Sequence, residues 1–167
     1  MDRQLRILVT GAGRGIGKAI VSQLKNDPLK HKIAVTARTE SELNEVVIGA
    51  LGETIVIAAD ATSVNIPNEI ISKVVAAWGG IDVIILNAGE ADVQKIEDTT
   101  DAIWEKTLAI NTTAPFRFIR AVTPIMKTQN SGRVIVIASI AGLMGEAFVT
   151  AYAASKHAVV GVVRASA

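Results

Sequence analysis

The stretch Thr10-Gly11-Ala12-Gly13-Arg14-Gly15-Ile16-Gly17 decides how this chain is interpreted. It follows the apolar run from Leu5 to Thr10 and precedes a helical pattern over about Ile16 to Lys25. It therefore predicts a tight turn from a strand into a helix, and it fits T-G-x-x-x-G-I-G rather than the general G-x-G-x-x-G pattern. Backbone amides and the helix dipole at such a turn can hold a pyrophosphate. The alternative is a turn that needs glycine only for its backbone conformation.

Short β-branched runs alternate with longer helical patterns along the whole chain. The expected strands cover residues 5–10, 33–37, 54–58, 82–86 and 133–138, and the expected helices cover residues 16–25, 41–47, 67–78, 100–129 and 152–167. Ser41 is expected to cap its helix, and Pro115 to bend the region 100–129 or divide it in two. The sequence thus predicts an α/β fold: one Rossmann-like domain over residues 1–167, with a five-stranded, doubly wound parallel sheet.

The composition excludes several classes of function. The 17 Lys+Arg residues nearly balance the 16 Asp+Glu residues and are scattered, so neither nucleic acid nor anionic lipid is an expected partner. There is no cysteine, and His31 and His157 are the only histidines, so no metal site is expected. Apolar runs fall short of the roughly 18 residues of a membrane span, and the start lacks the features of a signal peptide. We expect a cytoplasmic protein with no membrane partner, acting on a small molecule.

The residues after the second and third expected strands point to the type of cofactor. An acidic residue about 20 positions after the glycine turn would bind the ribose 2′-hydroxyl of NAD, but that count reaches Ala37 and Arg38. Arg38 and Arg14 can instead pair with a 2′-phosphate, which favours NADP(H) over NAD(H). The alternative is two solvated surface arginines. Asp60 can accept a hydrogen bond from the adenine amino group, or can cap a helix.

Tyr152 is the only tyrosine, and Lys156 follows it at the i+4 position of an expected helix. This spacing puts the phenol and the ammonium on one helix face, where both can address one bound molecule. Reduction of a carbonyl needs a proton donor at the oxygen, and a neighbouring cation improves a phenol for that task. Ser139, after the fifth strand, can hydrogen-bond the same oxygen or be a turn residue; Asn111 is either functional or a surface or kink residue.

Taken together, these motifs resemble those of the short-chain dehydrogenase/reductase family. The resemblance runs from Leu5 to the last residue, and the residues that carry it are Thr10 to Gly17, Asp60, Asn87-Ala88-Gly89, Asn111, Ser139, Tyr152 and Lys156. It implies that Tyr152 is the general acid/base and that Ser139 orients and polarises the substrate oxygen. It implies that Lys156 lowers the pKa of the phenol and holds the nicotinamide ribose, and that Asn111 supports a water-linked proton relay through Lys156.

The expected site follows from both lines of reasoning. The catalytic residues are Asn111, Ser139, Tyr152 and Lys156, and the cofactor-binding residues are Gly11, Gly13, Arg14, Gly15, Ile16, Gly17, Arg38, Asp60, Ala61, Asn87, Ala88, Gly89, Tyr152 and Lys156. Asn87 to Gly89 would also stabilise the central sheet. The chain departs from the family at Leu86, where another Asn is usual, and at Glu90, which places a carboxylate near the mouth of the cleft.

The expected function is NADP(H)-dependent interconversion of a carbonyl and a secondary alcohol by hydride transfer. The alternative is a noncatalytic nucleotide-binding or regulatory short form. Family members normally add further strands and a substrate lid, so the chain is expected to be C-terminally incomplete. Leu143, Met144 and Phe148 are candidates for an apolar substrate wall, and Glu90 or Glu146 for a polar contact; loop packing or solvated surface is the alternative. By resemblance, the long helical region and the last helix form a homodimer or homotetramer interface.

Overall fold

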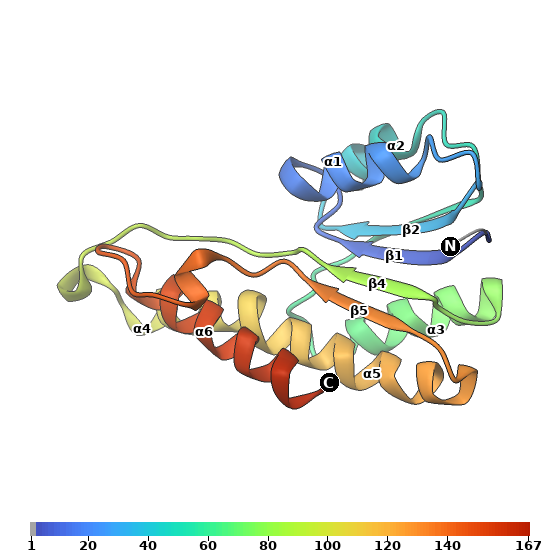
Figure 1. Ribbon diagram of the computed structural model, residues 1–167. Helices are drawn as coiled ribbons and strands as arrows, with labels where there is room; N and C mark the ends of the chain where they lie inside the picture. Colours follow the sequence, from blue (N-terminus) through green and yellow to red (C-terminus); the bar gives the residue numbers. More distant parts are fainter. Residues whose placement is uncertain (1–2) are drawn as a thin grey trace.

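Five parallel strands form one sheet in the computed structural model, which describes residues 3–167 (Figure 1). Their order is β3-β2-β1-β4-β5. The strands are β1 (Arg6–Thr10), β2 (Lys32–Ala37), β3 (Thr54–Ala58), β4 (Val83–Leu86) and β5 (Arg133–Val136). The order reverses between β1 and β4, and such a switch point is where open α/β sheets bind ligands. The predicted fold class is therefore confirmed; Met1 and Asp2, part of the expected domain, lie outside the described residues.

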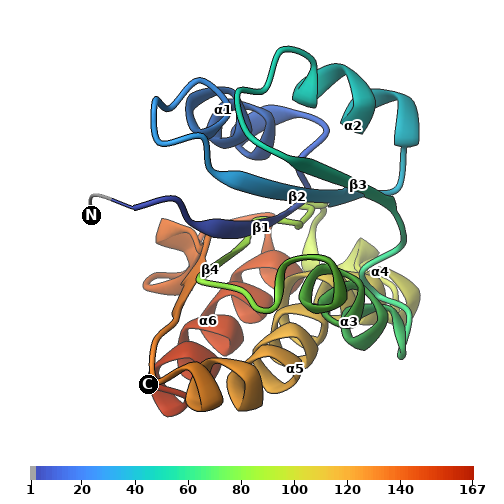
Figure 2. The ribbon, with the colours of Figure 1, turned by 90° about the vertical axis from the view of Figure 1, so that its right-hand side faces the viewer.

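The helices cover both faces of this sheet (Figures 1 and 2). One face carries α1 (Gly15–Leu24) and α2 (Glu40–Val47), and the other carries α3 (Ile66–Trp78), α4 (Asp101–Leu108), α5 (Ala114–Gln129) and α6 (Thr150–Ala165). A π-helical turn, η2 (Ala109–Thr113), joins α4 to α5, and the short 3₁₀ turns are η1 (Ile96–Asp98) and η3 (Ile140–Gly142). Within the described residues, no helix is long and apolar enough to cross a bilayer.

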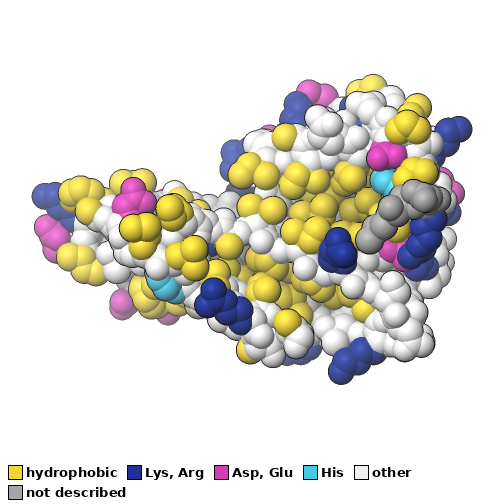
Figure 3. Space-filling view, viewed as in Figure 1, with side chains coloured by type: hydrophobic (Ala, Val, Ile, Leu, Met, Phe, Trp, Pro, Cys, Tyr) yellow, Lys and Arg dark blue, Asp and Glu magenta, His cyan; other side chains and the backbone are white. Residues whose placement is uncertain are grey.

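Alternation along the strands divides the core into two apolar layers. Ile7 and Val9 of β1 pack in the layer beneath α1 and α2, whereas Leu8 packs with Phe118 of α5 and Ile70 of α3. Because successive strand side chains point to opposite faces, a sheet covered on both sides needs apolar residues at nearly every position. Figure 3 shows hydrophobic side chains gathered on the sheet face next to α1.

Three local predictions need correction. Except for β3, the strands differ from the predicted bounds by one or two residues, and α6 begins at Thr150 rather than Tyr152. Ser41 is not the cap of α2: the helix begins at Glu40, after the extended residue Thr39, whose carbonyl accepts the first helical bond from Leu43. The region 100–129 is divided by the π-helical turn, and Pro115 lies in the first turn of α5, where no amide hydrogen is needed.

Candidate active site

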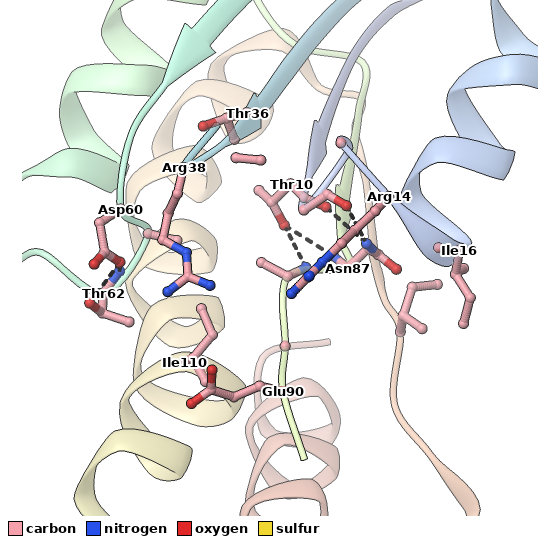
Figure 4. Close-up of a pocket in the computed structure, with 18 of the residues that line it drawn as sticks. Thr10, Arg14, Ile16, Thr36, Arg38, Asp60, Thr62, Asn87, Glu90 and Ile110 are labelled. Carbon is pink, nitrogen blue, oxygen red and sulfur yellow. Dashed lines mark hydrogen bonds between the residues drawn. The ribbon is translucent and has the colours of Figure 1, made fainter. Parts of the chain in front are cut away.

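A cleft of about 670 Å³ opens at the carboxyl edge of the sheet (Figure 4). Segments that follow all five strands line it, together with residues of α4, the π-helical turn and α6. Most of the residues predicted for the site are in this lining. Gly17, Asn111 and Ser139 are the exceptions, because each lies behind the surface of the cleft or beside it. The structure therefore brings most of the predicted residues together in one cleft, and their roles stay predictions.

The glycine-rich turn leaves no room for side chains where β1 meets β4. Gly11 has a φ of +63°, and a Cβ atom there would lie 2.7 Å from the Cα of Ala88. A Cβ on Gly17 would collide with the carbonyl oxygen of Gly11. Within the described residues, no side chain caps α1 or places an acid in its first turn. The amides that begin α1 are therefore free to bind an anion in the cleft.

Thr10 and Asn87 tie the end of β1 to the end of β4. The Thr10 hydroxyl accepts hydrogen bonds from the backbone N–H groups of Asn87 and Ala88, at 3.0 and 3.1 Å. The Asn87 side chain donates to the carbonyls of Thr10 and Gly11, at 3.2 and 3.0 Å. These four bonds hold the floor of the cleft at the point where the strand order reverses.

Charged residues of the cleft lining follow the ends of β1, β2 and β3. Arg14 and Arg38 both line the cleft, and Arg38 extends into it in Figure 4. Asp60 does not cap α3; its carboxylate accepts from the backbone N–H and the hydroxyl of Thr62, at 2.9 and 2.8 Å. These bonds, and secondarily the charge of Arg38, hold the pKa of Asp60 below its usual value. Arg117 secures the turn by donating to the Thr62 carbonyl at 2.7 Å.

Tyr152 and Lys156 line the same cleft from the first turns of α6. The Lys156 Nζ atom lies 5.6 Å from the centre of the Tyr152 ring and donates to the carbonyl of Ile137 at 3.0 Å. Lys156 is only 6% exposed, and this burial lowers the pKa of its ammonium group. The i,i+4 spacing thus places a phenol and a poorly solvated cation together in the cleft lining.

Ser139 lies immediately beyond the strand-end residues that line the cleft, Ile137 and Ala138. Its hydroxyl oxygen accepts a hydrogen bond from the backbone N–H of Ala141 at 3.1 Å and so caps the turn η3. Ser139 therefore has the turn role that the sequence left open. The hydroxyl hydrogen has no acceptor among the described residues, and it remains available to a ligand.

Asn111 is a buried structural link rather than a surface residue. It lies in the π-helical turn and is 1% exposed. Its side chain bonds both backbone groups of Glu90 and donates to the Ser155 hydroxyl at 3.0 Å. A Cβ on Gly89 would lie 2.8 Å from the Asn111 Oδ1 atom and 3.6 Å from the Lys156 Nζ atom. Asn111 and Lys156 therefore flank the same glycine.

Sequence reasoning missed two basic residues of this region, Arg117 and Lys106. Lys106 lines the cleft from α4, and its Nζ atom lies 2.8 Å from the Oε1 atom of Glu90. Neither residue belongs to a motif, so only a charged side chain within the expected helical region 100–129 marks them in the sequence. By contrast, Leu143, Met144 and Phe148 are each more than half exposed and are absent from the cleft lining of the described residues.

The fold and the cleft define the class: a Rossmann-like α/β protein whose cleft opens at the topological switch point between β1 and β4. The particular family follows from comparison with known sequences. The chain belongs to the short-chain dehydrogenase family, whose model matches residues 6–167.

Relatives with different names are similar to this chain in sequence. The chain is 31% identical over 160 residues to a D-beta-hydroxybutyrate dehydrogenase of Rhizobium meliloti, covering 94% of this chain and 62% of that protein. It is 32% identical over 164 residues to a 3-oxoacyl-(acyl-carrier-protein) reductase of Staphylococcus epidermidis, covering 96% of this chain and 66% of that protein. The chain therefore spans somewhat less than two thirds of the length of these two curated relatives.

Solved structures agree in fold. A metagenomic short-chain oxidoreductase in complex with NADP matches with a TM-score of 0.92 and 32% identity, over 100% of this chain and 77% of the other. A xylitol dehydrogenase bound to NAD+ matches with a TM-score of 0.91 and 29% identity, over 99% of this chain and 65% of the other. The relatives thus include a complex with each of the two nicotinamide dinucleotides.

Proposed function

We propose that this protein is an NADP(H)-dependent oxidoreductase that interconverts a small carbonyl compound and a secondary alcohol. The observation that carries the proposal is the shared cleft of Tyr152 and Lys156 with the glycine-rich turn. One end of the cleft suits a dinucleotide phosphate group, and the other presents a proton donor beside a buried cation. The membership of the chain in the short-chain dehydrogenase family supports this interpretation.

The residues present fit a nicotinamide dinucleotide. A side chain at Gly11 would fill the space beside Ala88, so the glycine keeps the backbone open for a close approach by a pyrophosphate. The free amides at the start of α1 would bind that pyrophosphate. Arg14 and Arg38 would pair with a 2′-phosphate, and the second oxygen of Asp60 would accept from the adenine amino group. These roles are proposals for the residues that line this end of the cleft.

When bound, NADPH supplies the hydride that forms the new C–H bond at the carbonyl carbon, and it is oxidised in doing so. As the C=O π bond breaks, its electron pair moves to the oxygen, and Tyr152 transfers its phenolic proton to that oxygen. Ser139 would donate its free hydroxyl hydrogen to the same oxygen and orient it. Lys156 holds a positive charge beside the phenol ring and favours the phenolate that remains. The reverse reaction uses Tyr152 as the base.

The substitution Tyr152→Phe tests the mechanism because it removes only the phenolic oxygen. We expect kcat with a reducible ketone to fall by about 10²-fold or more, as for loss of a general acid, while the affinity for NADPH stays near that of the wild type. Turnover by Tyr152→Phe at the wild-type rate contradicts the mechanism. NADPH binding without turnover in the wild-type protein would instead favour the noncatalytic alternative.

Arg38→Ala tests the cofactor preference, with Arg133→Ala as its matched control. Arg133 is an exposed arginine that begins β5, at the opposite edge of the sheet from the cleft. We expect Arg38→Ala to weaken NADPH binding about tenfold or more and NADH binding little, since a charge-assisted pair to the 2′-phosphate is lost. Arg133→Ala should change neither. Equal affinities for the two dinucleotides, unchanged in Arg38→Ala, contradict the preference.

We also propose a homodimer or homotetramer built on α4, α5 and α6. Trp104 and Phe116 are 39% and 43% exposed on these helices, and the Arg120 guanidinium lies 5.2 Å from the centre of the Phe116 ring. Exposed aromatic and arginine side chains are enriched where protein surfaces associate. Light scattering of the purified protein measures the mass of the particle, and a monomer at micromolar concentration contradicts the proposal.

A further inference from the structure

An ion pair stands at the cleft wall where neither the glycine motif nor the catalytic motif places a charge. The Nζ atom of Lys106, on α4, lies 2.8 Å from the Oε1 atom of Glu90 and 4.0 Å from the Oδ2 atom of Asp92. Lys106 and Glu90 both line the cleft that Arg14 and Arg38 enter from β1 and β2. The pair therefore belongs to the surface that a ligand in the cleft would meet.

Glu90 cannot easily move away from this position. Asn111 accepts from its backbone N–H at 3.0 Å and donates to its carbonyl at 2.8 Å. With its main chain held on both sides, Glu90 can change only its side-chain torsions. Its side chain is 25% exposed, whereas the Lys106 side chain is 60% exposed. The carboxylate is thus the more buried partner, on a main chain held by Asn111, and the ammonium is the more exposed one.

The charge of Arg38 also acts on Lys106. Glu90, as the nearest acceptor and negative charge, raises the pKa of Lys106, and the positive charge of Arg38 acts on the same ammonium in the opposite direction. In Figure 4, Arg38 and Glu90 extend into the cleft from different segments of the chain. A carboxylate near Arg38 opposes binding of any anion there unless a cation neutralises it.

We propose that Lys106 is a specificity-determining residue: by neutralising Glu90, it makes the adenosine end of the cleft acceptable to a 2′-phosphate. The inference rests on the proposed function, because it concerns the NADP(H) preference of the same site. The discrimination arises because a 2′-phosphate carries about two negative charges near neutral pH, whereas the 2′-hydroxyl of NADH carries none. An unpaired Glu90 therefore repels NADPH selectively, and it can accept a hydrogen bond from the hydroxyl of NADH.

The test is direct binding of NADPH and NADH, measured by calorimetry without a second substrate. The variants are Lys106→Gln, Glu90→Gln and the double variant, with Lys127→Gln as the matched control at an exposed position near the end of α5. We expect Lys106→Gln to weaken NADPH binding by about tenfold and NADH binding by less than about twofold, because one unpaired charge is left facing the phosphate. Lys127→Gln should change neither affinity.

The double variant separates neutralisation from direct phosphate binding by Lys106. If Lys106 acts through Glu90, removing both charges restores the NADPH affinity to within about threefold of the wild type. The effect of Lys106→Gln should also shrink at high salt, because these groups are exposed enough to be screened. A double variant as weak as Lys106→Gln, or equal weakening of both dinucleotides by Lys106→Gln, overturns the inference.

Arg38→Ala distinguishes this inference from the proposed cofactor preference. If Arg38→Ala weakens NADPH binding and Lys106→Gln does not, the preference stands and the role of Lys106 is wrong. If the wild-type protein binds neither dinucleotide, the proposed function is wrong and the inference falls with it. Thermal unfolding of each variant shows whether it is folded before its affinity is measured.

Discussion

The side-chain amide of Asn111 makes the same pair of bonds to Glu90 that a neighbouring strand would make. Its oxygen accepts from the Glu90 backbone N–H at 3.0 Å, and its nitrogen donates to the Glu90 carbonyl at 2.8 Å. Among the described residues no strand pairs with the chain at Glu90, so the amide replaces the sheet as the source of hydrogen bonds at this position. The π-helical turn makes this possible, because the wider turn directs Asn111 at that segment while α4 and α5 continue on either side.

Replacing Asn111 with Ala should destabilise the protein by about 3 kcal/mol, because the polar groups of Glu90 and Ser155 lose their partners. Chemical denaturation measures the change in the free energy of unfolding. Ser155→Ala is the matched variant: it removes the bond from the Asn111 nitrogen and the bond that the hydroxyl donates to the Tyr152 carbonyl, but it leaves both bonds to Glu90, and we expect a loss of about 1 kcal/mol. Equal losses in the two variants contradict a structural role for the bonds to Glu90.

Asp82 should make the stability of the protein dependent on acid pH. Its side chain is 5% exposed and accepts from Arg6 and Arg3, and the hydrogen bonds from Arg6 lower its pKa from 3.8 to about 2. Because the folded-state pKa is the lower one, the stabilisation is complete above about pH 4 and is lost as the pH falls towards 2. A shift of this size corresponds to roughly 2 kcal/mol.

The substitution Asp82→Asn should therefore cost roughly 2 kcal/mol at pH 7 and progressively less below pH 4, measured by denaturation at several pH values. Asp98→Asn is the control, because Asp98 is exposed in η1 and should change stability by less than about 0.5 kcal/mol. If the difference between wild type and Asp82→Asn does not diminish between pH 4 and 2, the pairing with Arg6 does not set the pKa of Asp82.

Two glycines in helices should respond to alanine in opposite ways. At Gly17 in α1, a Cβ atom would collide with the Gly11 carbonyl and lie 2.6 Å from the Asn87 Nδ2 atom, so Gly17→Ala should disrupt the glycine-rich turn. At Gly161 in α6, no heavy atom lies within 4 Å of the added carbon, and Gly161→Ala should stabilise the protein by about 0.5–1 kcal/mol. Thermal unfolding tests both, and a stabilising Gly17→Ala contradicts the close approach of α1 to Gly11.

Replacing Lys156 should increase the stability of the protein and reduce its activity. Burial lowers the pKa of its ammonium, so the charged form is disfavoured in the folded state. This cost to stability is largest when the pH is below the folded-state pKa. It disappears as the pH rises towards the pKa of lysine in the unfolded chain. We expect Lys156→Met to raise the unfolding temperature at pH 7, with a smaller difference near pH 10, and to lower kcat/KM by about 10²-fold or more. Lys127→Met is the control, because Lys127 is exposed and its replacement should change stability by less than about 0.5 kcal/mol. A Lys156→Met protein that is less stable at pH 7 would mean that the lost bond to Ile137 outweighs the cost of burial.

Local patterns in the sequence were sufficient for much of the architecture. The alternation of β-branched runs with helical stripes predicted five parallel strands, and β3 begins and ends at the predicted residues. Tyr152 and Lys156 were placed on one helix face because four residues make about one turn. The glycine-rich turn could be placed between β1 and α1 because both elements are recognised from their own periodicity.

Local sequence patterns were therefore enough to predict the class of fold, the carboxyl edge of the sheet as the position of the cleft, and most of the residues that line it. The folded chain alone shows that Asn111 binds Glu90, that Asp82 binds Arg6 76 positions away, and that Lys106 lines the cleft. The reason is physical: periodicity and turn chemistry depend on neighbours within a few residues, whereas these bonds form only after packing has brought distant segments together. Ser139 illustrates the difference between local and long-range information. The sequence places it directly after its strand, and the packing of η3 decides what its oxygen binds.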